Sequence, residues 1–146
     1  MMTAQDLPGE NFVVVDASVW VARLVSGDQF YQPVKKWMVD RRSRGVQFVS
    51  PTLLLPEVGG AIARRTGSFT LGRRAITRLE RLPGLRLVEM DNELVREAAL
   101  LSARLGLRGA DSLYVATAHR LSLPLVTFDM DQRERAQGQV KIQIIP

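Results

Sequence analysis

The chain has 146 residues, a hydrophobic share of 46%, a formal net charge of +5 and no cysteine. This length and apolar content suit one domain with its own packed core, and the lack of cysteine excludes disulfides, thiolate zinc sites and thiol nucleophiles. Residues 1–12 contain acids but no basic segment, which argues against a signal peptide. The longest apolar stretch, residues 48–63, is interrupted by two prolines and an acid and is shorter than the roughly 20 residues of a membrane span. We therefore expect a cytoplasmic protein without a membrane partner.

Most of the positive charge is carried by arginine, because Lys35, Lys36 and Lys141 are the only lysines. Guanidinium groups suit phosphate, and clustered basic residues are an electrostatic footprint of nucleic-acid binding. Such clusters also occur on solvated helix faces, so they favour a polyanion partner without identifying a site. The clusters are Arg41, Arg42 and Arg44, then Arg64 and Arg65, then Arg73, Arg74, Arg78 and Arg81.

Apolar runs alternate with stretches of helical spacing along the chain. In chain order they predict a strand at 12–15, helices at 17–25 and 30–42, a strand at 46–49, helices at 50–65 and 71–82, a strand at 85–90, helices at 92–106 and 110–122, and strands at 123–128 and 140–145. Continuous apolar strands separated by helices indicate a mostly parallel sheet covered on both faces. We predict a single α/β domain over residues 1–146, with a central sheet of four to five strands and helices on both faces.

Several helix ends carry recognisable signals. Ser50 followed by Pro51 is typical of an N-cap and a first helical residue, and Asp91 precedes a helix with Glu93 in its first turn. Gly106 is expected to close that helix. The turns between the predicted elements are too short to be domain linkers, which supports the single domain.

Acidic residues follow two of the predicted strands. Asp16 ends "FVVVD" and Asp129 ends "LPLVTFD", with Asp131 two residues later. In open α/β sheets, ligands bind beyond the carboxyl ends of the strands, so these side chains are expected at one edge. Glu57 and Asp111 interrupt stretches that otherwise look buried, and we expect both to face inward or into the same cleft.

Carboxylates gathered in this way need a counterion, because two of them about 5 Å apart repel by roughly 3 kcal/mol at an effective dielectric of about 20. Arginine could supply the charge, but Mg²⁺ or Mn²⁺ suits an all-oxygen set better. Such a cation would support phosphoryl chemistry on a nucleic acid. Each aspartate also has a simpler explanation, since Asp16, Asp129 and Asp131 could cap helices and Asp111 could favour a helix start.

Four segments, in this order and spacing, resemble the PIN domain, most closely the VapC-type toxins: "VVVDASVWVA", "LLLPEVGGAIARR", "GADSLYVATAH" and "LPLVTFDMD". The resemblance covers nearly all of the chain after residue 11. It implies a PIN-like, Rossmann-like three-layer fold and a type II toxin that is a Mg²⁺- or Mn²⁺-dependent endoribonuclease, in which a metal-activated water attacks an RNA phosphodiester. It also implies a cytoplasmic homodimer that is held inactive by a cognate antitoxin protein.

Carried over by motif, the metal-binding and catalytic acids are Asp16, Glu57, Asp111 and Asp129. The resemblance also implies that Ser18 and Thr127 line the site and that Asp131 assists through water.

One departure from the family pattern concerns the neighbours of Glu57. Pro56 precedes it, and Gly59 and Gly60 follow closely. Proline and glycine disturb helices, which leaves the orientation of Glu57 open.

Three other functions share parts of this pattern. An aspartyl phosphatase with Asp16 as nucleophile is disfavoured. The resemblance to such enzymes would require an Asp-x-Asp motif after the first strand, and here Ser18 occupies the position of the second aspartate. A nucleotide-binding Rossmann module is disfavoured because no glycine-rich loop follows residues 12–15. A non-catalytic RNA-binding or regulatory module that retains the fold is the main alternative, and the presence of all four acids argues against it.

Overall fold

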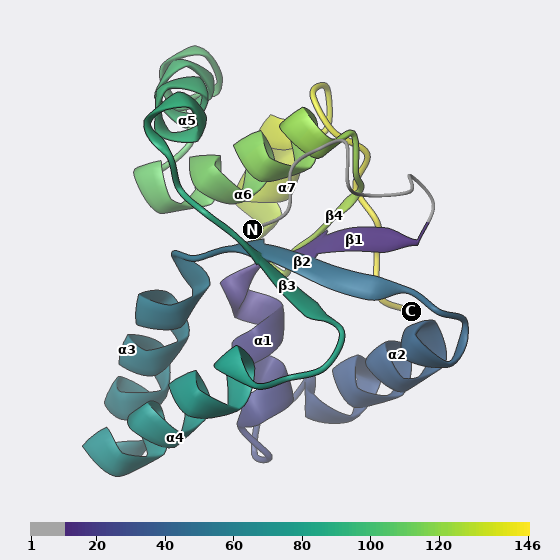
Figure 1. Ribbon diagram of the computed structural model, residues 1–146, viewed down its shortest axis with the longest axis vertical. Helices are drawn as coiled ribbons and strands as arrows, with labels where there is room; N and C mark the ends of the chain where they lie inside the picture. Colours follow the sequence, from purple (N-terminus) through teal and green to yellow (C-terminus); the bar gives the residue numbers. More distant parts are fainter. Residues whose placement is uncertain (1–10) are drawn as a thin grey trace.

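A computed structural model describes residues 11–146, and the predictions for residues 1–10 lie outside this range. Four parallel strands form one sheet in the order β3-β2-β1-β4 (Figure 1). Their bounds are Phe12–Val15 for β1, Gln47–Pro51 for β2, Leu85–Val88 for β3 and Leu125–Val126 for β4. The predicted α/β class with a parallel sheet is confirmed.

Seven helices are formed by the described residues, and they cover both faces of the sheet (Figure 1). Helices α1 to α4 lie on one face and α5 to α7 on the other, which gives the three layers that were predicted. No helix within residues 11–146 combines the length and apolarity needed to cross a membrane. The helices are α1 (Ala17–Leu24), α2 (Tyr31–Ser43), α3 (Leu54–Thr66), α4 (Phe69–Glu80), α5 (Asn92–Leu105), α6 (Gly109–Leu121) and α7 (Met130–Ala136).

Strand β1 lies inside the sheet and has a fully buried sequence, Phe12–Val15. Val14 pairs with Val49 of β2 on one side and with Leu125 of β4 on the other. A strand with neighbours on both edges and helices on both faces has no wet side, so every position is apolar. This burial explains why the run continues unbroken until Asp16.

The predicted helix at 50–65 is wrong at its start, because α3 begins at Leu54 and Ser50 and Pro51 end β2. Ser50 is fully buried, and its Oγ donates to the backbone oxygen of Val15 at 2.6 Å and accepts from Trp20 Nε1 at 3.3 Å. The Ser50 hydroxyl, which the sequence pattern assigned to a helix N-cap, therefore forms tertiary hydrogen bonds to β1 and α1. The N-cap at Asp91 and the end of α5 at Gly106 are confirmed.

The last two strands are shorter than predicted. The run at 123–128 contributes only Leu125–Val126, because the chain then turns toward α7, a helix absent from the predicted elements. The run at 140–145 is reduced to one parallel bridge between Ile142 and Leu125. Alternating polar residues in "VKIQII" suit an edge position with few partners better than a buried strand.

Pro56 and the glycines of α3 do not break this helix. Pro56 lies in the first turn, where backbone N–H groups have no intrahelical acceptor, so no helical hydrogen bond is lost. The next residue, Glu57, donates its N–H to the Leu53 oxygen at 3.2 Å. Gly59 lies against α4, where a Cβ atom on Gly72 would approach the Gly59 oxygen to 2.7 Å.

Gly72→Ala tests this close approach of α3 and α4. Helix propensity alone predicts that alanine stabilises α4 by about 1 kcal/mol. We expect the opposite, a loss of about 1–3 kcal/mol, because the added methyl group meets backbone that has to move. Urea unfolding measures the change, and Thr77→Ala on the exposed face of α4 is the control, expected to be neutral or slightly stabilising. Stabilisation of both variants would contradict the packing described here.

Candidate active site

Asp16 and Asp129 each follow a strand and begin the next helix. The Asp16 carboxylate caps α1 by accepting from Ser18 N at 3.0 Å, and Asp129 caps α7 by accepting from Gln132 N at 3.0 Å. The capping alternative left open by the sequence is thus confirmed for both. Each cap uses one carboxylate oxygen and leaves the other, Oδ1 of Asp16 and Oδ2 of Asp129, for a further partner.

Asp16 is 5% exposed, and its Oδ2 atom receives every polar contact that residues 11–146 make with this carboxylate. Ser18 Oγ donates to Oδ2 at 2.6 Å, and Thr127 Oγ1 lies 3.1 Å from it. Ser18 Oγ also accepts from Phe128 N at 3.1 Å, which ties the start of α1 to the segment after β4. Ser18 and Thr127 therefore lie beside Asp16, as the resemblance implies.

Thr127 connects Asp16 to a buried residue that the sequence analysis missed. Thr127 Oγ1 lies 2.7 Å from Gln132 Oε1, and Gln132 Nε2 donates to the Asp111 backbone oxygen at 3.2 Å. The Gln132 side chain is fully buried. A signal existed, because Asp129 followed three residues later by glutamine has the spacing of a capping box, which also predicts α7.

Glu57 lies in the first turn of α3 and is half-buried. Its Oε1 accepts from the hydroxyl of Tyr114 at 2.7 Å. Burial raises the pKa of Glu57, and the negative charges of Asp16 and Asp111 raise it further, while the Tyr114 hydrogen bond opposes the shift. Tyr114 is itself fully buried on α6, and only the tertiary structure shows that it orients Glu57.

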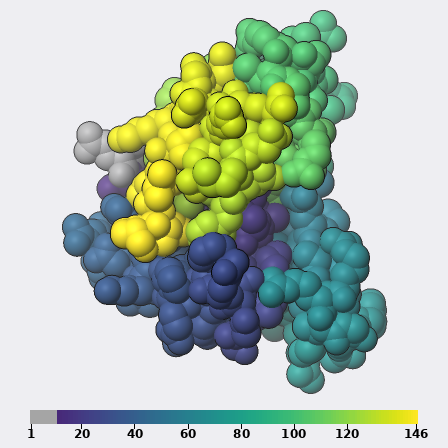
Figure 2. Space-filling model, turned by 180° about the vertical axis from the view of Figure 1, so that it is seen from behind, coloured from purple at the N-terminus to yellow at the C-terminus, as the bar shows by residue number. Residues whose placement is uncertain are grey.

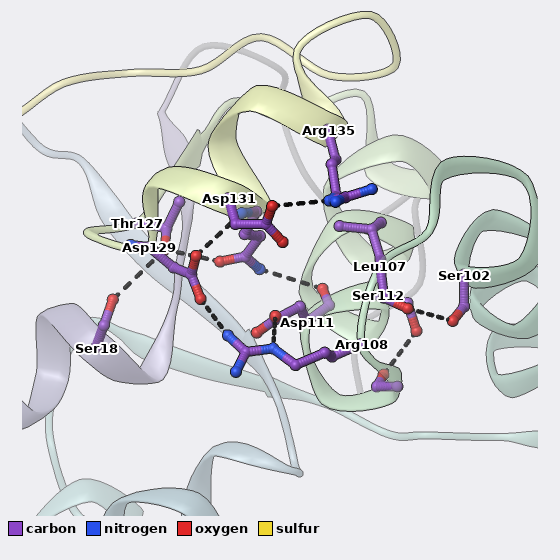
Figure 3. A network of polar contacts seen from close by, with 12 residues as sticks. Ser18, Ser102, Leu107, Arg108, Asp111, Ser112, Thr127, Asp129, Asp131 and Arg135 are labelled. Carbon is purple, nitrogen blue, oxygen red and sulfur yellow. Dashed lines mark hydrogen bonds and ion pairs between the residues drawn. The ribbon is translucent and has the colours of Figure 1, made fainter.

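Asp111, in the first turn of α6, and Asp129 share one cationic partner (Figure 3). Arg108 Nε donates to Asp111 Oδ2 at 3.1 Å, and Arg108 Nη2 donates to Asp129 Oδ2 at 2.6 Å. Burial and the Asp16 charge raise the pKa of Asp111, and Arg108 partly opposes this. The Arg108 side chain is 73% exposed, so its position is set by these two ion pairs more than by packing.

Asp131 lies apart from these four acids. Its carboxylate pairs with Arg135 Nε at 2.8 Å on the same helix, and it is not the cap of α7 (Figure 3). An accessory role through water remains a prediction.

The four acids share one edge of the sheet but do not form a closed ligand set. Within residues 11–146, no three Asp, Glu or His side chains are placed to hold one metal ion together. Asp16 nevertheless raises the pKa values of Glu57 and Asp111, which shows that their charges interact. The available donors are hard carboxylate oxygens with excess negative charge, the chemistry that suits Mg²⁺ or Mn²⁺.

The protein is thus an open parallel α/β domain with four carboxylates at the edge of the sheet where the strands end. The family model of the PIN domain matches residues 13–138. The chain therefore belongs to the PIN-domain family, as its motifs predicted. No relative in sequence is found among curated proteins.

Solved structures share the fold at low sequence identity. VapC20 of Mycobacterium tuberculosis, described as a sarcin-ricin loop cleaving toxin, has a TM-score of 0.75 and 20% identity, covering 90% of this chain and 98% of that one. VapBC2 of Rickettsia felis, bound to a DNA fragment from its promoter, has a TM-score of 0.69 and 11% identity, with coverage of 92% and 99%. FitAcB of Neisseria gonorrhoeae has a TM-score of 0.66 and 18% identity, with coverage of 92% and 96%.

Glu57→Gln tests how far the negative charge of Glu57 destabilises the folded protein in the absence of metal. Because the pKa of Glu57 is raised on folding, the folded chain binds more protons than the unfolded chain at pH values just above the ordinary glutamate pKa of 4.5. The free energy of unfolding therefore falls as the pH rises through this range. At pH 7 in EDTA, we expect the variant to be more stable than the unaltered protein by more than the ~0.5 kcal/mol usual for surface substitutions. The gain should shrink on acidification.

Urea unfolding between pH 7 and the ordinary glutamate value of 4.5 measures this difference. Glutamine keeps an oxygen that accepts from Tyr114, so the hydrogen bond is retained. Glu134→Gln, on the exposed surface of α7, makes the same charge change and is the control. A stability difference for Glu57→Gln that grows at low pH would contradict the raised pKa.

Proposed function

We propose that this protein is a Mg²⁺- or Mn²⁺-dependent endoribonuclease that acts as the toxin of a type II toxin-antitoxin pair. The observation that carries the proposal is the placement of Asp16, Glu57, Asp111 and Asp129 at one edge of a PIN-domain sheet, where the charge of Asp16 acts on both Glu57 and Asp111. Excess carboxylate charge at this edge is otherwise unfavourable, and it favours a bound divalent cation.

These four acids would hold the metal, with Asp16 contributing Oδ1, which no donor from residues 11–146 contacts. When bound, a divalent cation neutralises the carboxylates, lowers the pKa of water and stabilises charge on a phosphodiester. Asp111 and Asp129 would have to exchange Arg108 for the cation. The exposure of Arg108 allows this movement.

The remaining residues of the site orient the acids. Ser18 and Thr127 hold Asp16 through its Oδ2 atom, and Tyr114 holds Glu57 through Oε1. Fixing the ligands in this way reduces the reorganisation needed when the cation binds. Gln132 extends the support by linking Thr127 to the backbone at Asp111.

The proposed partners follow from the structural neighbours. The Rickettsia felis structure is a complex bound to promoter DNA, and another neighbour is a toxin-antitoxin complex from Klebsiella pneumoniae. These similarities support a cognate antitoxin as a protein partner. We also propose a cytoplasmic homodimer, on the family resemblance alone. The neighbour that is described as a sarcin-ricin loop cleaving toxin and the net charge of +5 support our proposal of RNA as the substrate.

Asp16→Asn tests the proposed activity. The protein, purified without any partner, is incubated with total cellular RNA in Mg²⁺ or Mn²⁺ and in EDTA. We expect discrete fragments only with metal, and at least about a 100-fold slower rate for the variant, because removing groups that merely support metal ligands costs about 10–100-fold. Asparagine is as good an N-cap as aspartate, so α1 should remain capped and the fold intact.

Two outcomes would contradict the proposal. Equal cleavage by the Asp16→Asn variant would remove this acid from the reaction. Folded protein that cleaves no RNA but binds it equally well with either residue would favour the alternative, a non-catalytic RNA-binding module.

Arg108→Gln tests the exchange between arginine and metal. Arg108 makes two ion pairs with acids of the site, and its exposure to solvent keeps both of them weak. Removing this weak competitor should tighten Mn²⁺ binding by at most about tenfold. Isothermal titration calorimetry measures the affinity, with Arg104→Gln at an exposed position as the control. Weaker binding in Arg108→Gln would show that Arg108 supports the metal site and does not compete with it.

A further inference from the structure

A groove of about 600 Å³ begins at the acidic edge and runs between α1 and α3. These two helices lie side by side below the sheet (Figure 1). The space-filling view shows residues from the purple start of the chain at the bottom of a hollow bordered by the teal helices and the yellow-green C-terminal segments (Figure 2). The groove is lined by Ala17, Ser18, Val21, Leu53, Pro56, Glu57, Ala61, Arg64 and Arg65.

Glu57 and Arg64 lie on the same face of α3, two helical turns apart. Between them the helix presents only Gly60 and Ala61, so no large side chain separates the acid from the guanidinium. The Arg64 side chain folds back toward the helix N-terminus, and its Nη1 atom lies 3.0 Å from the point where a Cβ on Gly60 would be. The positive charge is therefore directed along the groove toward the acidic edge.

Arg65 differs from Arg64 in its pairing. Its Nη1 donates to Asp28 Oδ2 at 2.8 Å, while Asp28 Oδ1 accepts from Phe30 N at 2.8 Å. The charge of Arg65 is thus neutralised by a carboxylate that is fixed to the backbone. Arg64 forms no ion pair with any acid of residues 11–146, so it brings an uncompensated positive charge into the groove.

We propose that this groove binds the backbone of single-stranded RNA next to the bond that is cut, with Arg64 contacting a phosphate. The inference rests on the proposed function and adds the path of the substrate. A groove of about 600 Å³ lies in the ~300–1,000 Å³ range of small-ligand sites, so it holds only a short length of one strand. Positive charge along a groove that follows the backbone is the usual means of binding single strands, and here Arg64 supplies that charge.

The test measures RNA binding without cleavage. Asp16→Asn protein in EDTA is titrated against a fluorescein-labelled single-stranded RNA of mixed sequence, and fluorescence anisotropy is read between 50 and 200 mM salt. Adding Arg64→Gln should weaken binding several-fold and reduce the slope of log K against log salt by about 0.7, the value for one phosphate contact on a single strand. Arg73→Gln on α4, exposed and outside the groove, makes the same charge change and should leave the slope unaltered.

Asp28→Asn is an independent test, because it should change RNA affinity in the direction opposite to Arg64→Gln. Asparagine still accepts from Phe30 N but no longer neutralises Arg65, so binding should become tighter and the salt slope steeper by about 0.7. This gain cannot come from a loss of folding. Urea unfolding should place Arg64→Gln within about 0.5 kcal/mol of its parent.

Failure of the groove and failure of the nuclease are distinguishable. Metal-dependent cleavage by the unaltered protein, together with equal RNA binding by Arg64→Gln and Arg73→Gln, would overturn the groove and keep the nuclease. RNA binding that depends on Arg64 without cleavage would keep the groove and overturn the nuclease. Absence of RNA binding, or preference for duplex over single strand, would overturn the groove.

Discussion

Like-charge repulsion among four carboxylates is the constraint on which the arrangement of this protein depends. Each acid lies at the start of a helix: Asp16 and Asp129 cap α1 and α7, and Glu57 and Asp111 lie in the first turns of α3 and α6. A negative charge in such a position is stabilised by about 0.3–1 kcal/mol. The helix starts offset part of the repulsion, and the raised pKa values of Glu57 and Asp111 show that part of it remains.

Arg108 supplies the only cation that pairs with these acids among residues 11–146. Its guanidinium joins Asp111 and Asp129 in the structure, although they are separated along the chain. An exposed arginine can stabilise Asp111 and Asp129 in the absence of metal and still leave them when a divalent cation binds. The metal-free fold and the proposed metal-bound site are then compatible, because Asp111 and Asp129 have a cationic partner in both.

Arg64 places a positive charge next to the acidic edge of the sheet. Acids occupy the carboxyl edge of the sheet, and Arg64 lies two turns along α3 in the same groove. A polyanion would be repelled by the edge alone, so an adjacent positive charge is needed to bring a phosphodiester close to it. The close packing of α3 on α4 at Gly59 and Gly72 fixes the helix that carries both Glu57 and Arg64.

The sequence by itself determined the α/β class, the parallel sheet and the PIN-domain family, and it singled out the four acids that we propose as metal ligands. The periodicity of apolar residues and the position of acids after strands involve residues that are close together in the sequence. Such patterns can be recognised without knowing the fold. Only the tertiary structure decided that Ser50 bonds to β1 instead of capping a helix, that the run at 140–145 has one bridging partner, and that Tyr114, Gln132 and Arg108 hold the acids. These roles depend on contacts between segments far apart in the chain, which no local pattern specifies.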